Sequence, residues 1–167
     1  MRFEKREKIF LVGYSFYGDP FTSNAGWTEE NEIGRLWNRF MSYLQKVNDP
    51  IAGLIKNKEW FEVWIENEES KNKGFFEIFV GTNIDSLDNV PYDLQIKVLP
   101  ATEYAVFTVK GEQIKTDWAY QQYKKGLDTG KYRKSSFDFC IELYDERFKG
   151  VDKISESELD YYFPINK

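Results

Sequence analysis

The chain has 167 residues, about the length of one domain, and its 23 Lys and Arg against 28 Asp and Glu give a net charge of −5. This acidic balance argues against a general nucleic-acid binder, the lack of His excludes His-based catalysis and His metal ligands, and a single Cys excludes internal disulfides and thiolate zinc clusters. The chain starts without an apolar leader, and no stretch approaches the ~18 apolar residues of a membrane span, so we expect a cytoplasmic protein that contacts no membrane and needs no metal or cofactor.

The first half of the chain predicts a strand, a helix and a strand hairpin. Residues 9–17 form the first strand, and a polar loop follows it. Residues 59–66 alternate as a strand, 71–74 form a turn, and 75–80 return as another strand. The helix lies between the first two strands, with Thr28 as a candidate N-cap and Asp49-Pro50 beyond its end. Its apolar stripe has 3.6-residue spacing and consists of Ile33, Leu36, Trp37, Phe40, Met41, Leu44 and Val47.

The second half repeats this order. Residues 103–109 and 137–144 form strands, and residues 159–165 form the closing strand. The helix between the first two carries one apolar side, made of Ile114, Trp118, Ala119, Tyr123 and Leu127.

The repeat predicts one domain over residues 1–167. Repeat one covers about 8–82 and repeat two about 101–167, joined by an acidic connector over about 83–100 that contains a candidate strand at 94–99. We expect tandem β-α-β-β repeats related by a pseudo-twofold axis in one antiparallel sheet, with two helices on one face. This is an α+β class. Two separate domains are the alternative, but about 80 residues with one helix would bury little.

Two predicted strands carry acids and aromatic rings on one face. We expect the odd positions of 137–144, which are all apolar, to pack under the helices and the even positions to face the other way. The even row holds Asp138, Cys140, Glu142 and Tyr144, and the matching row of the earlier strand holds Trp60, Glu62 and Trp64. In the last strand, Asp160 and Tyr162 share a face that could reach the same cleft, while Tyr161, Phe163 and Ile165 are the expected core row.

A carboxylate between aromatic rings has a physical consequence. The rings exclude water and push the pKa of the carboxyl upward, and an organic cation would restore a counter-charge and gain ring contacts worth roughly 0.5–2 kcal/mol each. The plain alternative is that Glu62 and Glu142 are solvated strand residues covered by Trp rings. Two equivalent strands with the same arrangement favour a pocket. Cys140 points toward it, but a buried, inert thiol is the better default.

The second half resembles the gyrase-inhibitor-like (GyrI-like) effector-binding family. The resemblance is carried by residues 98–107 (VLPATEYAVF), Gly111, Trp118, residues 139–144 (FCIELY) and residues 162–165 (YFPI), and it extends over nearly the whole chain. It implies a tandem β-α-β-β fold and a ligand cleft between the repeats, as in the effector-binding parts of AraC- and MerR-type multidrug regulators.

The resemblance also implies site residues. The family's acidic position maps to Glu142, with Trp118 and Tyr144 beside it, and our own reading of the repeat adds Glu62. The regulators carry a helix-turn-helix region before this domain, whereas this chain starts its first strand within about ten residues, so we expect no direct DNA binding by it.

Three functions remain open. The first, which we favour over an enzyme, is a stand-alone protein that binds amphipathic or cationic compounds in an aromatic cleft with a central glutamate. The second is a hydrolase of strained electrophilic compounds, with Glu142 as general base toward a water and Tyr144 as donor or orienting group. The third is a module that inhibits gyrase or binds another protein partner, such as a regulator. The expected ligand-binding residues are Glu142, Tyr144, Trp118, Trp64, Trp60, Glu62 and Tyr162.

Overall fold

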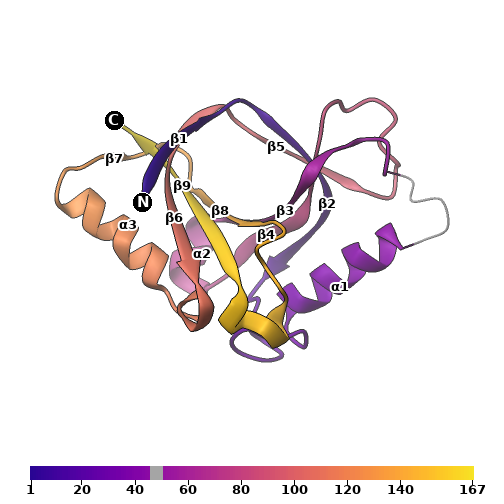
Figure 1. The fold of residues 1–167 in the computed structure, drawn as a ribbon, viewed down its shortest axis with the longest axis horizontal. Helices are drawn as coiled ribbons and strands as arrows, with labels where there is room; N and C mark the ends of the chain where they lie inside the picture. Colours follow the sequence, from indigo (N-terminus) through magenta and orange to yellow (C-terminus); the bar gives the residue numbers. More distant parts are fainter. Residues whose placement is uncertain (46–50) are drawn as a thin grey trace.

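The computed structural model describes residues 1–45 and 51–167. These residues form one curled antiparallel sheet with helices on one of its faces (Figure 1). In chain order the elements are β1 (Arg2–Arg6), β2 (Ile9–Gly18), α1 (Glu32–Leu44), β3 (Ile55–Ile65), α2 (Glu68–Lys73), β4 (Phe76–Ile84), β5 (Gln95–Leu99), β6 (Thr102–Lys110), the 3-10 turn η1 (Gly111–Lys115), α3 (Trp118–Asp128), β7 (Arg133–Lys134), β8 (Phe139–Tyr144), the 3-10 turn η2 (Val151–Glu156) and β9 (Glu158–Asn166).

The strand order shows the predicted internal symmetry. It runs β1-β6-β9-β8-β3-β4-β2-β5, with the short β7 beside β9. The order reads the same from both ends when β2, β3 and β4 are matched with β6, β8 and β9, and α1 with α3. The α+β class, with two repeats merged into one sheet, is therefore confirmed.

Each repeat also has a neighbouring strand that pairs with the other repeat. β1 precedes the first unit but pairs with β6 of the second, and β5 precedes the second unit but pairs with β2 of the first. β5 corresponds to the candidate strand in the connector. β1 was not predicted, because its sequence, RFEKR, has a single apolar residue and no hydrophobic alternation.

Several helix and turn boundaries differ from the predicted ones, and local hydrogen bonds and backbone angles explain the differences. Asn31, not Thr28, caps α1, because its side-chain oxygen accepts the Gly34 amide at 2.9 Å. Residues 68–73 form the short helix α2 in place of a simple turn, and Gly74 ends it with φ of 71°. The predicted helix position Val47 and the Asp49-Pro50 stop lie outside the described residues.

The sheet faces are the reverse of the prediction. The odd row of β8 joins Phe61 and Val63 in a core on the face away from α1 and α3, and this core also draws residues from β2, β4, β5, β6 and β9. This face closes on itself because the sheet curls. The even row, with Glu62, Glu142 and Tyr144, lies on the face that carries α1 and α3. The error arose because both faces are buried, so apolar alternation alone does not tell which one the helices cover.

The curl brings two backbones close together. Gly13 in β2 is the register partner of Gly81 in β4. A Cβ atom at Gly13 would overlap the carbonyl oxygen of Val80, and one at Gly81 would overlap that of Val12. Only glycine fits at both positions.

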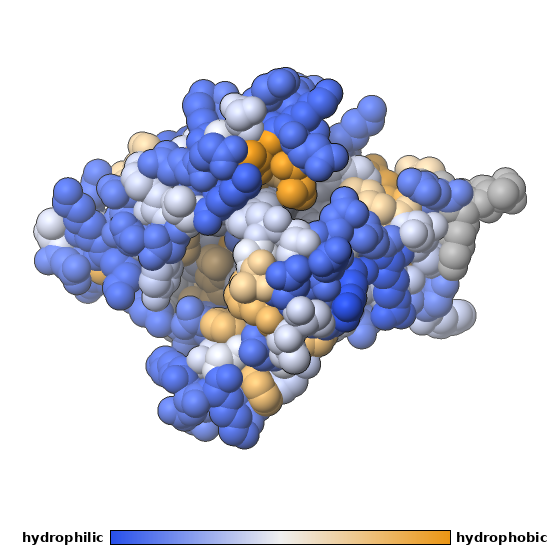
Figure 2. Space-filling view, turned by 90° about the horizontal axis from the view of Figure 1, so that it is seen from below, coloured by the Kyte–Doolittle hydropathy of each residue, from blue (hydrophilic) through white to orange (hydrophobic). Residues whose placement is uncertain are grey.

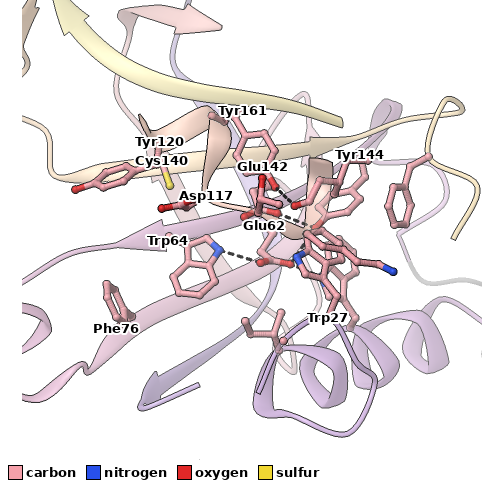
Figure 3. Close-up of a pocket in the computed structure, with 18 of the residues that line it drawn as sticks. Trp27, Glu62, Trp64, Phe76, Asp117, Tyr120, Cys140, Glu142, Tyr144 and Tyr161 are labelled. Atoms are coloured by element: carbon pink, nitrogen blue, oxygen red, sulfur yellow. Dashed lines mark hydrogen bonds between the residues drawn. The ribbon is translucent and has the colours of Figure 1, made fainter. Parts of the chain in front are cut away.

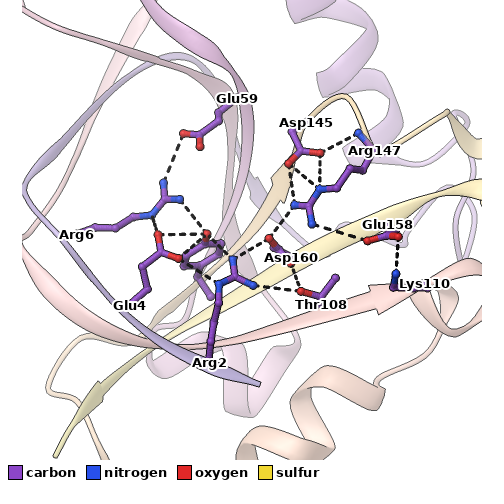
Figure 4. A network of polar contacts seen from close by, with 11 residues as sticks. Arg2, Glu4, Arg6, Glu59, Thr108, Lys110, Asp145, Arg147, Glu158 and Asp160 are labelled. Carbon is purple, nitrogen blue, oxygen red and sulfur yellow. Dashed lines mark hydrogen bonds and ion pairs between the residues drawn. The ribbon is translucent and has the colours of Figure 1, made fainter.

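Charged groups hold β1 in place across the closed face (Figure 4). Arg2 contacts the Asp160 carboxylate at 2.9 Å, and Arg6 donates to the Tyr162 hydroxyl at 2.8 Å. Arg147 reaches the same Asp160 at 2.8 Å. Burial acts to raise the pKa of Asp160, but hydrogen bonds from Arg2, Thr108 and Arg147 lower it to about 2. β1 is therefore held by ion pairs and side-chain hydrogen bonds as well as by its backbone pairing with β6.

Candidate functional site

A large cavity lies between α1 and α3, with β3, β8 and β9 as its floor. Its volume is about 990 Å³, near the upper end for small-molecule sites. Seen from the helix side, the surface is hollowed, and apolar side chains lie within the hollow among hydrophilic neighbours (Figure 2). Residues of the loop before α1 and of the segment after β8 complete the wall.

Two glutamates stand side by side on the floor. Glu62 in β3 and Glu142 in β8 are direct register partners in the antiparallel pair, so both side chains point to the same face. They are 4% and 9% exposed. Burial of two neighbouring acids is costly unless hydrogen bonds or opposite charge compensate it.

Glu62 is held by two indoles (Figure 3). Trp37 in α1 donates its Nε1–H to Oε2 at 2.7 Å, and Trp64 in β3 donates to Oε1 at 2.8 Å. Both carboxylate oxygens therefore receive a strong donor. Such donors favour the ionised form of the acid.

Glu142 is held differently. Its Oε2 lies 3.0 Å from the Tyr144 hydroxyl, which also lies 3.3 Å from Glu62 Oε2. A phenol has one hydrogen and can donate it to only one of these oxygens. If Glu142 carries a proton, it donates to Tyr144 and Tyr144 donates to Glu62, so that each contact contains one hydrogen.

The electrostatics agree with this assignment. Burial raises the pKa of Glu62 above its ordinary value, and hydrogen bonds from Trp37, Trp64 and Tyr144 oppose this rise. Burial raises the pKa of Glu142 well above its ordinary value, and the neighbouring Glu62 charge raises it further. We therefore assign the negative charge of the pair to Glu62 and the shared proton to Glu142.

Aromatic rings surround the pair. The Tyr144 ring packs edge-on against Trp37 and Phe148, with centroids 5.2 and 4.9 Å apart. Trp64 packs in the same way against Phe76 at 5.4 Å. The walls therefore offer several ring faces and edges to an apolar or cationic guest.

The cavity as a whole is acidic. Seven acidic side chains and four lysines line it, so a guest meets an excess of negative charge. Lys134 is paired with Asp138 at 2.6 Å near the rim. The groups that set the pKa values of Glu62 and Glu142 include no basic side chain. Among the described residues, the pair thus lacks a positive partner.

Comparison with known proteins gives the family. Residues 2–165 match the family model Cass2, described as integron-associated effector binding protein. The chain belongs to this family. It is also 30% identical over 167 residues to the transcriptional regulator BrlR of Pseudomonas aeruginosa, covering 98% of this chain but 54% of that protein. The chain thus spans about half the length of this relative.

Solved structures show the same fold. SAV2435 bound to tetraphenylphosphonium superposes with a TM-score of 0.66 at 12% identity, covering 99% of this chain and 93% of that one. EcmrR in complex with DNA superposes with a TM-score of 0.71 at 16% identity, covering 99% and 57%. These structures show the fold, while the family model and the match to BrlR relate this Cass2-family chain to effector-binding domains of transcription regulators.

The structure brings five of the seven predicted site residues together. Glu62, Glu142, Tyr144, Trp60 and Trp64 all line the cavity of this Cass2-family chain. Whether they bind a ligand stays a prediction.

Trp118 and Tyr162 lie elsewhere. Trp118 packs against the core under α3, edge-on to Phe107 at 6.4 Å. Tyr162 is the register partner of Ile141, so it lies on the closed face of the sheet beside Arg6. Glu142 pairs instead with Tyr161, which lines the cavity. Side chains alternate along a strand, so Tyr162 cannot share that face, and we leave both residues out of the proposed site.

Sequence reasoning missed other wall residues. The sequence predicts Trp37 only as part of the apolar stripe of its helix, and this stripe does not show that its indole reaches Glu62. Trp27 and Phe148 come from irregular segments and meet across the cavity with centroids 6.4 Å apart. No periodic pattern in the sequence predicts such a contact.

The chemistry available to the site is that of acids and phenols. No group of three metal-ligating side chains occurs among the described residues. Burial raises the pKa of the Cys140 thiol well above its ordinary value, which makes the thiol a poor nucleophile.

No described helix has the length and apolarity that a bilayer crossing requires.

Glu142 makes the stability of the folded chain depend on pH. Its pKa is higher in the folded state than the ordinary value of 4.5, so its contribution is fully present below pH 4.5 and is lost as pH rises toward the folded pKa. We expect the free energy of unfolding to fall by up to ~1.4 kcal/mol per pH unit in this window. In Glu142→Gln the fall should be shallower, as measured by urea unfolding from pH 5 to 8.

Two comparisons sharpen this test. Glu68→Gln, an exposed change in α2, should keep the wild-type slope. The low pKa of Asp160 affects stability only at pH values below its ordinary 3.8, outside the measured range. Equal slopes in wild type and Glu142→Gln would contradict the assignment of the proton to Glu142.

Proposed function

We propose that this chain is an effector-binding protein that takes amphipathic organic cations into the cavity between α1 and α3. The observation that carries the proposal is the Glu62–Glu142 pair: buried acids on an aromatic floor, with no basic partner among the described residues. A guest with positive charge would supply that partner.

The surroundings of the pair favour a large, ring-bearing guest. Contacts between a desolvated cation and an aromatic ring contribute about 2 kcal/mol, and less where water remains. The lining rings come from α1, β3, β8 and two irregular segments, so they approach a guest from several sides. Such a lining suits guests of varied shape, because dispersion and desolvation need no exact hydrogen-bond match.

The relatives support the same proposal. SAV2435, which shares the fold, was solved with tetraphenylphosphonium, a lipophilic cation. BrlR, with which this chain shares 30% identity, is a transcriptional regulator. We propose that this chain serves regulation as its ligand-sensing part. DNA contact belongs to other protein segments or partners in this proposal.

Tryptophan fluorescence tests the proposal directly. Trp64 lines the cavity and contacts Glu62, whereas Trp118 lies outside it, so the two provide a matched pair of variants. Tetraphenylphosphonium should quench the wild-type emission with saturation. Trp64→Phe should weaken binding about tenfold, because it removes one ring wall and one hydrogen bond to the anion. Trp118→Phe should bind within a factor of two of wild type.

Two results would count against cation binding in the cavity. One is an absence of saturable quenching by tetraphenylphosphonium and other lipophilic cations. The other is an equal loss of affinity in Trp64→Phe and Trp118→Phe.

The hydrolase alternative uses the same floor. A protonated Glu142 at 3.0 Å from Tyr144 and an ionised Glu62 at 3.3 Å from it form an acid–base set suited to proton transfer. Mass spectrometry of strained electrophilic compounds after incubation with the protein distinguishes the two functions. A product lost in Glu142→Gln would favour the enzyme, and unchanged compound that is retained with the protein would favour binding.

A further inference from the structure

The acidic pair has two carboxyl groups that share one phenol, and this geometry assigns the negative charge to Glu62 and a proton to Glu142. We propose that the pair discriminates guests by charge: a monocation binds while Glu142 keeps its proton, and a compact dication binds with release of that proton. This inference rests on the proposed function, since it concerns the same site and the same kind of guest.

Hydrogen counting supports the first half. Tyr144 lies within hydrogen-bond distance of an oxygen of Glu62 and of Glu142, and its single hydrogen satisfies only one of these contacts. A proton on Glu142 satisfies the other. A single positive charge facing Glu62 balances the negative charge of the pair. No second positive charge then lies beside Glu142 to favour its ionised form. The proton can stay where it is.

A second positive charge changes the balance. Glu62 and Glu142 are register partners, so their side chains stand close to the ~5 Å separation of cross-strand neighbours. A guest with two cationic centres a few ångströms apart therefore faces both acids at once. An unpaired ammonium buried beside a neutral carboxyl is costly, and ionising Glu142 removes that cost. The proton then leaves to the solvent.

Other charged groups also face Glu142. The nearest titratable neighbours are Glu62 in β3, Cys140 and Tyr144 in β8 and Tyr161 in β9. Burial and the carboxylates raise the pKa of Cys140, Tyr144 and Tyr161, so these groups stay protonated near neutral pH. The charges at the rim come from η1 and α3, from the segments beside β3 and β8 and from the loop before α1. The acids are Glu29, Glu66, Asp117, Asp138 and Asp145, and the lysines are Lys115, Lys124, Lys134 and Lys149. Comparison with Glu142→Gln cancels their contribution.

Calorimetry with a matched pair of permanently charged probes tests the inference. Benzyltrimethylammonium carries one cationic centre, and its xylylene-bridged bis-trimethylammonium counterpart carries two, so neither probe titrates. Titration at pH 6.5 in two buffers of different ionisation enthalpy counts the protons released. We expect close to one proton for the dication and less than about a third of a proton for the monocation. The dication affinity should rise about tenfold per pH unit between pH 5.5 and 6.5, and the monocation affinity should change little.

Glu142→Gln gives the second readout. It keeps the Glu62 anion but has no proton to release, so the dication should bind without a buffer-dependent enthalpy and at least tenfold more weakly. For the monocation the variant should release no proton either, so the difference in proton count between the two probes should disappear.

The outcomes separate this inference from the proposed function. If both probes bind wild type with the same proton count, the inference is wrong while cation binding stands. If neither probe nor tetraphenylphosphonium binds, the proposed function itself is wrong.

Discussion

Changing Glu62 to Gln is expected to lower the affinity for tetraphenylphosphonium about 30-fold at pH 7. The variant removes the anion that Trp37 and Trp64 hold on the cavity floor at 2.7 and 2.8 Å. A desolvated charge contact of this kind contributes about 2 kcal/mol, which corresponds to that loss. Ionised Glu142 is a poor substitute, because among the described residues Tyr144 alone could donate a side-chain hydrogen bond to it, whereas two indoles donate to Glu62.

The other acids give the comparison. Glu142→Gln alone should change the monocation affinity less than about threefold, and the double variant should bind more weakly than Glu62→Gln alone. Glu66→Gln makes the same chemical change at the half-buried rim of the cavity and should cost less than threefold, since water and salt screen its charge. Equal losses in Glu62→Gln and Glu66→Gln would show that the general acidity of the cavity, and not its floor, attracts the guest. Circular dichroism and thermal unfolding check the fold of each variant.

Gly13→Ala is expected to destabilise the chain by about 3 kcal/mol, near the upper end for an overpacked core. Its new methyl group would overlap the carbonyl oxygen of Val80, which belongs to backbone and cannot rotate away. For a chain of this size the midpoint of thermal unfolding should fall roughly 6–12 °C. Gly53→Ala is the control, because a Cβ at Gly53 meets nothing within 4 Å. A midpoint in Gly13→Ala within 2 °C of Gly53→Ala would contradict the close approach of β2 and β4.

The sequence was informative where its two halves agree. The apolar stripe of α1, the alternation of β3 and the repeated order of elements predicted the architecture. The match between residues 62–64 and 142–144 predicted that two acids share one face. The register Glu62↔Glu142 shows that they do. Duplication helped here because each copy of the pattern is independent support for the other.

The sequence was weaker where two faces look alike. In β9 both rows contain Tyr residues, so Tyr162 and Tyr161 could not be told apart without the register to β8. The same ambiguity reversed the face that the helices cover. Trp37 and Trp118 occupy matching helices, yet of the two only Trp37 reaches the acid. Trp37 lies inside α1, whereas Trp118 is the first residue of α3 and packs against Phe107. These choices depend on long-range packing, which local periodicity does not carry.

The exchange of β1 and β5 affects how any signal could leave the cavity. Because each repeat has an edge strand that pairs with the other repeat, the two repeats are interlocked. We therefore expect no hinge motion that separates them around a guest. The arginine contacts of β1 reinforce that lock. We therefore expect ligand binding to move the parts outside the sheet, namely α1, α3 and the loop before α1 that carries Trp27, while the interlocked sheet keeps its shape.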